Sequence, residues 1–257
     1  MTALIALLAA AAPIITKPLE YELPAGGGLA AGPADGYLAY RATKELGRPG
    51  VLIVHDWDGV DDYEQGRARQ LASLGYVALA VDVYGKGLRP HGEERGKVAG
   101  GFYGDRAGFR ARLKAGYDAL MKTGLVSKDR VGIMGYCFGG MGALEAGRAG
   151  FPLRAIVTFH GALNNPNPAD ARNIKGDTLI LHGADDPFVP VQEIAAFETE
   201  MRAARRPYRI VKYKGAVHAF TVPSAGNDPK SPVRYDAKAD RESFGEMERF
   251  FARRLGR

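Results

Sequence analysis

Short apolar runs alternate with longer stretches of helical periodicity along most of the chain, and this pattern predicts its architecture. The apolar runs predict strands at residues 51–54, 77–81, 131–134, 155–159, 178–181 and 208–213. Helices are expected near residues 61–74, 106–122, 138–149, 190–204 and 238–254. Strands that alternate with helices in this way form a mostly parallel sheet with helices on both faces. The sequence therefore predicts an α/β fold, in which ligands bind beyond the carboxyl ends of the strands.

The N-terminal region departs from this alternation. Residues 19–23 and 36–40 predict a pair of antiparallel edge strands, joined by a loop that contains the glycines at 26–28. No internal repeat is evident. The chain has 257 residues, of which 46% are hydrophobic and 25% charged, a composition typical of a soluble globular domain. We expect a single domain over residues 15–257.

An apolar, alanine-rich stretch at residues 2–14 precedes these strands. It is too short to span a bilayer as a stable helix. It resembles the apolar region of a signal peptide, but it lacks a basic start and has Pro13 where cleavage would fall. We interpret residues 1–14 as a possible signal peptide or apolar extension, which favours a periplasmic or secreted location over a cytoplasmic one.

The formal net charge of +6 suggests nucleic-acid binding, but the placement of the basic residues argues against it. They follow a predicted helix end and strand, as on a solvated face, and no recognised nucleic-acid motif accompanies them. These residues are Arg202, Arg205, Arg206, Arg209, Lys212 and Lys214. No cluster of Cys, His and carboxylates has metal-ligand spacing. We expect a monomer or homodimer that acts on a small molecule, with no nucleic acid, stable membrane insertion, metal or cofactor.

The segment Gly-Tyr-Cys-Phe-Gly at residues 135–139 lies between an apolar strand and a helix of small residues. It has the pattern of the G-x-S-x-G nucleophile elbow, with cysteine in place of serine. The flanking glycines let the turn hold its central residue in a strained conformation without collisions. The sulfur is presented at a helix N-terminus, where the aligned peptide dipoles are expected to lower the thiol pKa. A lone cysteine is often a small buried hydrophobe, but this context favours a catalytic Cys137.

The elbow requires an acid and then a histidine further along the chain, and Asp186 and His218 follow in that order. Asp186 lies in the turn after the strand at 178–181, and His218 lies in a loop after the strand at 208–213. Imidazole takes and returns a proton near neutral pH, while a carboxylate fixes its tautomer. With cysteine as the nucleophile, the pair can rest as thiolate and imidazolium.

Other acids and histidines compete for these roles. Asp185 is the closest competitor for the acid, and we interpret it as the turn residue because Asp186 keeps the better register against residues 188–190. The remaining histidines lack the chain position that the elbow requires, so we interpret them as structural or lining residues. They are His55, His91, His160 and His182.

Four segments carry a resemblance to a known family. They are Asp82–Gly87, Gly135–Gly140, His182–Pro190 and Gly215–Thr221. In this order and spacing they resemble the dienelactone hydrolase family of α/β-hydrolases, over a stretch from about Pro18 to Phe251. The resemblance implies an α/β-hydrolase fold and a carboxylic ester hydrolase. It implies Cys137 as the nucleophile, His218 as base and acid, and Asp186 as the orienting carboxylate.

Further site residues follow from the elbow. The backbone N–H groups of Phe138 and Trp57 are expected to form the oxyanion hole, because one follows the nucleophile and the other lies in the loop after the strand at 51–54. An apolar, partly aromatic pocket is expected around the sulfur. The substrate contacts that we predict are Asp56, Tyr84, Arg106, Phe188 and Phe220.

Two features depart from the best-known family pattern. Dienelactone hydrolases of the chloroaromatic pathway carry a glutamate in the early loop that pairs with the resting cysteine, where this chain has Asp56, whose shorter side chain has less reach. Those enzymes also hold the substrate carboxylate with arginines, one of them shortly after the catalytic histidine, whereas residues 219–222 offer none. Arg95 and Arg106 are rival candidates for the other arginine. These departures argue against dienelactone itself as the substrate.

The chemistry predicted is cleavage of an ester or lactone through an acyl-thioester on the cysteine. A broad-specificity carboxylesterase or thioesterase is the nearest alternative. A thiol redox protein would lack a second cysteine to resolve a sulfenic acid, because the chain has only one. A non-catalytic binding protein of the same fold would have no need to retain Cys137, Asp186 and His218 in this order.

Overall fold

The computed structural model describes residues 12–256. Most of the predicted N-terminal segment, residues 1–11, lies outside the described residues. The strands are β1 (Ile14–Leu23), β2 (Gly32–Arg41), β3 (Arg48–Val54), β4 (Val77–Val81), β5 (Val126–Tyr136), β6 (Ala155–Phe159), β7 (Asp177–Gly183) and β8 (Tyr208–Tyr213). The helices are α1 (Asp62–Ser73), α2 (Glu94–Gly104), α3 (Arg106–Lys122), α4 (Phe138–Arg148), α5 (Val191–Ala203) and α6 (Ala237–Leu255), with short 3₁₀ helices η1 (Pro168–Asn173) and η2 (Pro223–Ala225).

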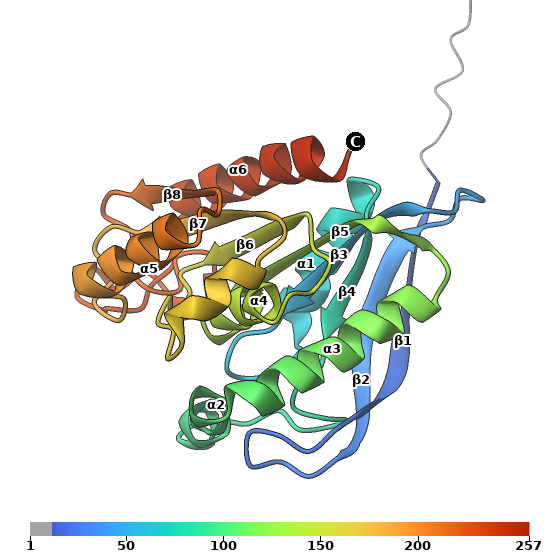
Figure 1. Cartoon of the computed structure of the whole chain (residues 1–257), viewed down its shortest axis with the longest axis horizontal. Helices are drawn as coiled ribbons and strands as arrows, with labels where there is room; N and C mark the ends of the chain where they lie inside the picture. Colours follow the sequence, from blue (N-terminus) through green and yellow to red (C-terminus); the bar gives the residue numbers. More distant parts are fainter. Residues whose placement is uncertain (1–11, 257) are drawn as a thin grey trace, which may run out of the picture.

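The strands form one eight-stranded sheet in the order β1-β2-β4-β3-β5-β6-β7-β8 (Figure 1). β1 is antiparallel to β2 and β2 is antiparallel to β4, whereas β4 and the strands beyond it in this order run parallel. The predicted mostly parallel sheet with antiparallel N-terminal edge strands is therefore confirmed. Its topology is the α/β-hydrolase fold.

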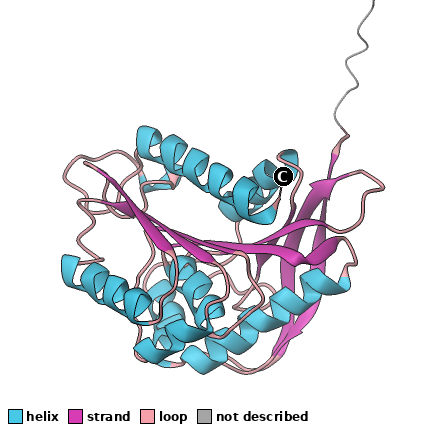
Figure 2. Ribbon diagram, turned by 45° about the horizontal axis from the view of Figure 1, so that its top comes forward, coloured by secondary structure: helices cyan, strands magenta, loops and turns pink. Residues whose placement is uncertain are grey.

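Helices cover both faces of the sheet (Figure 2). Successive side chains of a strand point to opposite faces, so a fully buried strand supplies two cores. β3 packs Leu52 and Val54 into the core shared with α3, α4 and α5. It packs Val51 and Ile53 into the core shared with α1 and α6. The sheet thus lies between two helical layers, and loops follow the carboxyl ends of its parallel strands.

The sequence did not predict α2, because this glycine-rich segment buries only Ala99 and Phe102. One of its glycines permits a close approach, since a Cβ at Gly101 would collide with the carbonyl oxygen of Gly27. The Gly27 N–H also donates to the carboxylate of Asp105, the residue that caps α3, at 2.9 Å. The glycine loop between β1 and β2 is thereby fixed against α2 and the start of α3.

The segments that follow β3, β5, β7 and β8 carry the predicted triad and oxyanion residues at the carboxyl edge of the sheet. Within residues 12–256, no helix is both long enough and apolar enough to cross a membrane.

Candidate active site

Cys137 stands at the turn between β5 and α4, with φ 49° and ψ −113°. Residues other than glycine rarely adopt a positive φ, so the turn is strained. Glycines stand two positions away on either side, at Gly135 and Gly139, because no side chain fits at these two places. A Cβ at Gly135 would collide with the backbone of Gly139, and a Cβ at Gly139 would meet the carbonyl oxygens of Val54 and His55. The turn therefore lies directly against the end of β3.

The three predicted triad side chains are joined by hydrogen bonds. His218 Nε2 lies 3.1 Å from Cys137 Sγ, and His218 Nδ1 lies 2.8 Å from Asp186 Oδ2. A carboxylate can only accept, so the Nδ1–H donates to Asp186 and Nε2 is left to accept the thiol proton. Side chains from three segments that are distant in sequence are thus connected by hydrogen bonds, from the Asp186 carboxylate through His218 to the Cys137 sulfur.

The position of Asp186 is fixed by its own turn. Its side chain is fully buried, and its second oxygen, Oδ1, accepts the Phe188 N–H at 2.8 Å. The neighbouring Asp185 is exposed and has no such contact with the histidine. Of the two adjacent acids, Asp186 is the one that the turn directs toward His218.

The loop between β3 and α1 carries Asp56 and Trp57. The carboxylate of Glu64 in α1 accepts the N–H groups of Asp56 and Asp61, at 3.3 and 3.2 Å. The Tyr84 hydroxyl donates to the Trp57 carbonyl oxygen at 3.1 Å. This loop is therefore held from two sides, which fixes its backbone beside the elbow.

The two expected oxyanion donors are both engaged in this structure. The Phe138 N–H hydrogen-bonds to the sulfur of Cys137. The Trp57 N–H donates to Asp56 Oδ1 at 2.5 Å. In this structure the Trp57 N–H is thus occupied by the carboxylate of the residue before it.

The Asp56 side chain reaches the thiol despite its short length. Its carboxylate is hydrogen-bonded to Cys137, so the lost methylene relative to glutamate is compensated by the path of the loop. Removal from water raises the pKa of Asp56 to about 6, and the nearby charge of Asp58 acts in the same direction. Because this folded-state pKa lies above the ordinary value of 3.8, stability is lost as the pH rises through about 6. The ionised carboxylate costs about 2 to 3 kcal/mol at pH 8.

The prediction of a lowered thiol pKa is wrong. Removal from water raises the pKa of Cys137 well above its usual value, and the Asp56 charge raises it further. The hydrogen bond from the Phe138 N–H acts in the opposite direction and is outweighed. The sulfur of Cys137 is accordingly a thiol at neutral pH.

Exchange of Asp56 for asparagine is expected to increase the alkylation rate of Cys137 by iodoacetamide about tenfold at pH 7.5, because the negative charge that opposes the thiolate is removed. Since the chain has one cysteine, the loss of free thiol reports this residue directly. Asp58→Asn is the matched control, because that side chain pairs with Arg95 at 3.6 Å. An unchanged alkylation rate in Asp56→Asn would contradict this explanation of the raised pKa.

A cavity of about 240 Å³ opens at the sulfur. It is lined by Asp56, Trp57, Tyr103, Cys137, Ala162, Phe188, Val189, His218, Ala219 and Val233. Three of these side chains form an exposed aromatic rim, with Trp57 44%, Tyr103 40% and Phe188 56% exposed. Ala162 and Val233 were not predicted, because they come from long loops without any motif.

Three predicted substrate contacts lie outside this lining. Tyr84 is buried in an aromatic cluster, with its ring centroid 5.6 Å from that of Phe138. Phe220 is fully buried and packs against His160. Arg106 stacks over the Tyr103 ring at 5.2 Å and donates to Asn164. Asp56 and Phe188 do line the cavity.

A second histidine packs against the loop of His218. The buried His160 ring lies edge-to-face with the His218 ring, with a centroid distance of 5.3 Å. Its Nε2 lies 2.8 Å from Thr221 Oγ1, which lies 2.7 Å from the Tyr63 hydroxyl. Burial holds the pKa of His160 well below its usual range, so the ring stays neutral. These residues lie on three distant segments, and no sequence signal connected them.

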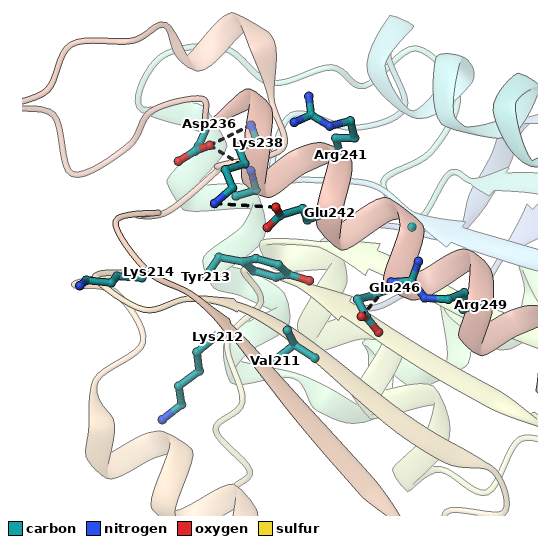
Figure 3. A pocket seen from close by; sticks show the side chains of 12 residues that line it. Val211, Lys212, Tyr213, Lys214, Asp236, Lys238, Arg241, Glu242, Glu246 and Arg249 are labelled. Atoms are coloured by element: carbon teal, nitrogen blue, oxygen red, sulfur yellow. Dashed lines mark hydrogen bonds and ion pairs between the residues drawn. The ribbon is translucent and has the colours of Figure 1, made fainter.

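A larger groove of about 560 Å³ lies between β8 and α6 (Figure 3). It is lined by charges of both signs, several of them paired, such as Arg249 with Glu246 and Lys238 with Glu242. No Cys, Ser, Thr or His lines it. Despite its size, this groove lacks a pair such as the thiol and imidazole of Cys137 and His218, so the small cavity at Cys137 is the candidate active site.

A strand, a strained nucleophile turn and a helix at the carboxyl edge of this sheet define an α/β-hydrolase. The family model that matches residues 34–255 is described as the dienelactone hydrolase family. The chain belongs to the dienelactone hydrolase family and is a carboxylic ester hydrolase.

Individual relatives agree with this assignment. A probable 2-oxo-3-(5-oxofuran-2-ylidene)propanoate lactonase from Bradyrhizobium is 31% identical, over 71% of this chain and 78% of that protein. A putative carboxymethylenebutenolidase from Methylorubrum extorquens is 31% identical, over 71% of this chain and 67% of that protein. The crystal structure of a dienelactone hydrolase-like promiscuous phosphotriesterase from metagenomic libraries has a TM-score of 0.88 and 35% identity, and the match covers 96% of this chain and 100% of that chain.

Proposed function

We propose that the protein hydrolyses small carboxylic esters or lactones through an acyl-thioester on Cys137, with His218 and Asp186 completing the triad. The observation that carries this proposal is the line of two short contacts, 3.1 Å from sulfur to imidazole and 2.8 Å from imidazole to carboxylate. Hydrogen-bond reach between nucleophile, base and orienting group is the geometry that covalent catalysis requires.

Acylation begins when Sγ attacks the substrate carbonyl carbon and its proton passes to His218 Nε2. The carbonyl oxygen becomes an oxyanion, which the N–H groups of Phe138 and Trp57 stabilise once the Asp56 carboxylate has turned away. The imidazolium then gives its proton to the leaving oxygen as the carbon–oxygen bond breaks. The acyl group is left on the sulfur as a thioester. The alcohol of an ester then departs, whereas the hydroxyl formed from a lactone stays attached to the acyl chain.

Deacylation reverses the roles of the same groups. His218 takes a proton from a water molecule as its oxygen attacks the thioester carbon. The carbon–sulfur bond breaks, the acid product leaves, and the sulfur recovers the proton from the imidazolium. The Asp186 side chain stabilises the imidazolium in both halves of the reaction.

The substrate class follows from the size and lining of the cavity. Its volume of about 240 Å³ is smaller than the roughly 300–1,000 Å³ of sites for drug-sized ligands. A compact acyl group or a lactone ring fits this space, and the exposed rings of Trp57 and Phe188 offer an apolar surface to an aromatic leaving group. Because one structural relative is named a promiscuous phosphotriesterase, a neutral phosphotriester belongs in the substrate panel beside esters, lactones and thioesters.

Exchange of Asp186 for asparagine is expected to lower kcat for p-nitrophenyl acetate about 10²- to 10³-fold with little change in KM, because the imidazole loses its orienting charge and its correct tautomer. The neighbouring exchange Asp185→Asn is the matched control and is expected to stay within twofold of the parent. Equal losses in both variants, or a loss in Asp185→Asn alone, would contradict the assignment of the acid.

A further inference from the structure

The cavity at Cys137 contains no positive side chain to receive an anionic group. Among the residues that line it, Asp56 is the only carboxylate, and neither Lys nor Arg is present. Tyr103 also lines it, but burial raises the pKa of its phenol far above neutrality. The cavity therefore has a negative or neutral interior, although the whole chain carries a net charge of +6.

The two arginines that stack on rings of the cavity lining also have other partners. Arg95 stacks over the Trp57 ring at 5.9 Å and pairs with Asp58 at 3.6 Å. Arg106 stacks over the Tyr103 ring at 5.2 Å. Both guanidinium groups contact rings that line the cavity without lining it themselves. In this structure neither guanidinium group is part of the lining beside the sulfur, where a bidentate pair with a substrate carboxylate would form.

Asp56 lies next to the position of the reacting carbonyl. Its carboxylate bonds both to the thiol and to the Trp57 N–H, the two groups that the substrate carbonyl would approach. The Asp56 backbone N–H is held by the Glu64 carboxylate at 3.3 Å. A rotation of the Asp56 side chain therefore moves its carboxylate but leaves it in the wall of the cavity. In so small a cavity, any charged substituent of the substrate lies close to this carboxylate.

From this arrangement we propose that the site selects uncharged esters and lactones, and that the Asp56 carboxylate imposes the selection by repelling substrates that carry a carboxylate. This inference rests on the proposed function and adds to it the charge of the substrate. Selection by repulsion is as effective as selection by attraction, because specificity is a difference between two affinities. For unit charges about 8 Å apart at an effective dielectric constant of about 20, the expected discrimination is about 30-fold, and it rises at shorter separations.

The test compares two substrates of equal size. One is the mono-p-nitrophenyl ester of trans-cyclopropane-dicarboxylic acid, which is an anion, and the other is the same ester with its free carboxylate replaced by a carboxamide. The trans ring keeps the free carboxylate from attacking its own ester. Each kcat/KM is divided by the hydroxide-catalysed rate of the same compound, which removes differences in intrinsic reactivity.

The parent protein is expected to prefer the carboxamide by about 30-fold or more, and Asp56→Asn is expected to reduce this preference to below about threefold. The comparison uses a ratio within each variant, so a change in overall rate through Asp56 does not affect it. Asp58→Asn is the matched control and should keep the parent ratio, because Asp58 does not line the cavity.

A parent ratio near one would overturn the inference. So would a high ratio that Asp56→Asn leaves unchanged, since the charge would then have another source. Asp56→Asn is expected to fold, because it removes a buried charge. Failure of the proposed function has a different signature, namely no turnover of either ester by the parent, or turnover that persists in Cys137→Ala.

Discussion

Replacement of Cys137 by alanine is expected to lower kcat/KM for aryl esters by about 10⁴-fold or more. The sulfur is the atom that would form the thioester, and none of the other residues that line the cavity combines a nucleophile with a neighbouring base. Removal of one small atom group from a part-buried position leaves the fold intact, so the variant should still bind substrate. The measurement is the steady-state rate with p-nitrophenyl acetate, corrected for the spontaneous rate.

Two controls give this result its meaning. The thermal unfolding midpoint of Cys137→Ala should stay close to that of the parent, which excludes unfolding as the cause of lost activity. Cys137→Ser keeps a nucleophilic atom in the same place and should retain more activity than the alanine variant. Activity of Cys137→Ala within tenfold of the parent would exclude covalent catalysis by this residue.

Exchange of Gly139 for alanine is expected to destabilise the fold by more than about 3 kcal/mol, the largest stability effect that we predict for a single methyl group. The added Cβ would meet the carbonyl oxygens of Val54 and His55, which belong to the backbone at the end of β3. A flexible side chain could move aside at small cost, but these atoms belong to the central sheet and to the loop that carries Trp57. Urea unfolding of the purified variant measures the effect.

The matched control is Gly100→Ala in α2. A Cβ at this exposed helical position meets no atom within 4 Å. Alanine has a higher helix propensity than glycine, so a gain of about 0.5 to 1 kcal/mol is expected there. If Gly139→Ala unfolded at the same urea concentration as the parent, the tight packing of the elbow against β3 would be refuted.

The parallel sheet could be predicted from sequence because its strands are buried on both faces and appear as uninterrupted apolar runs. The ends of the strands were harder to place. β5 extends over residues 126–136, whereas the apolar run covers only 131–134, because the polar residues 127–130 continue the strand at its solvated end. α2 was missed because glycine-rich composition lowers helix propensity, and its stability comes from packing against the glycine loop between β1 and β2.

For the candidate site, the nucleophile turn and the order of Asp186 and His218 could be taken from the chain, because one motif constrains them both. The raised pKa of the Cys137 thiol could not be predicted from the sequence. It depends on burial and on the Asp56 carboxylate, whose reach is decided by the hydrogen bonds of Glu64 to the loop. Tyr84 and Phe220 were expected at the cavity from their aromatic character, but nothing in sequence separates a lining ring from a core ring.

The mass of the protein after it is mixed with an aryl carbamate tests the covalent route most directly. A carbamoyl group transferred to sulfur is hydrolysed slowly, so the covalent species accumulates. The expected result is one added carbamoyl mass per protein, located on the peptide that contains Cys137. One equivalent of phenol is released as this group is transferred. Turnover of esters with no added mass, or an added mass on a different residue, would contradict a thioester route through this cysteine.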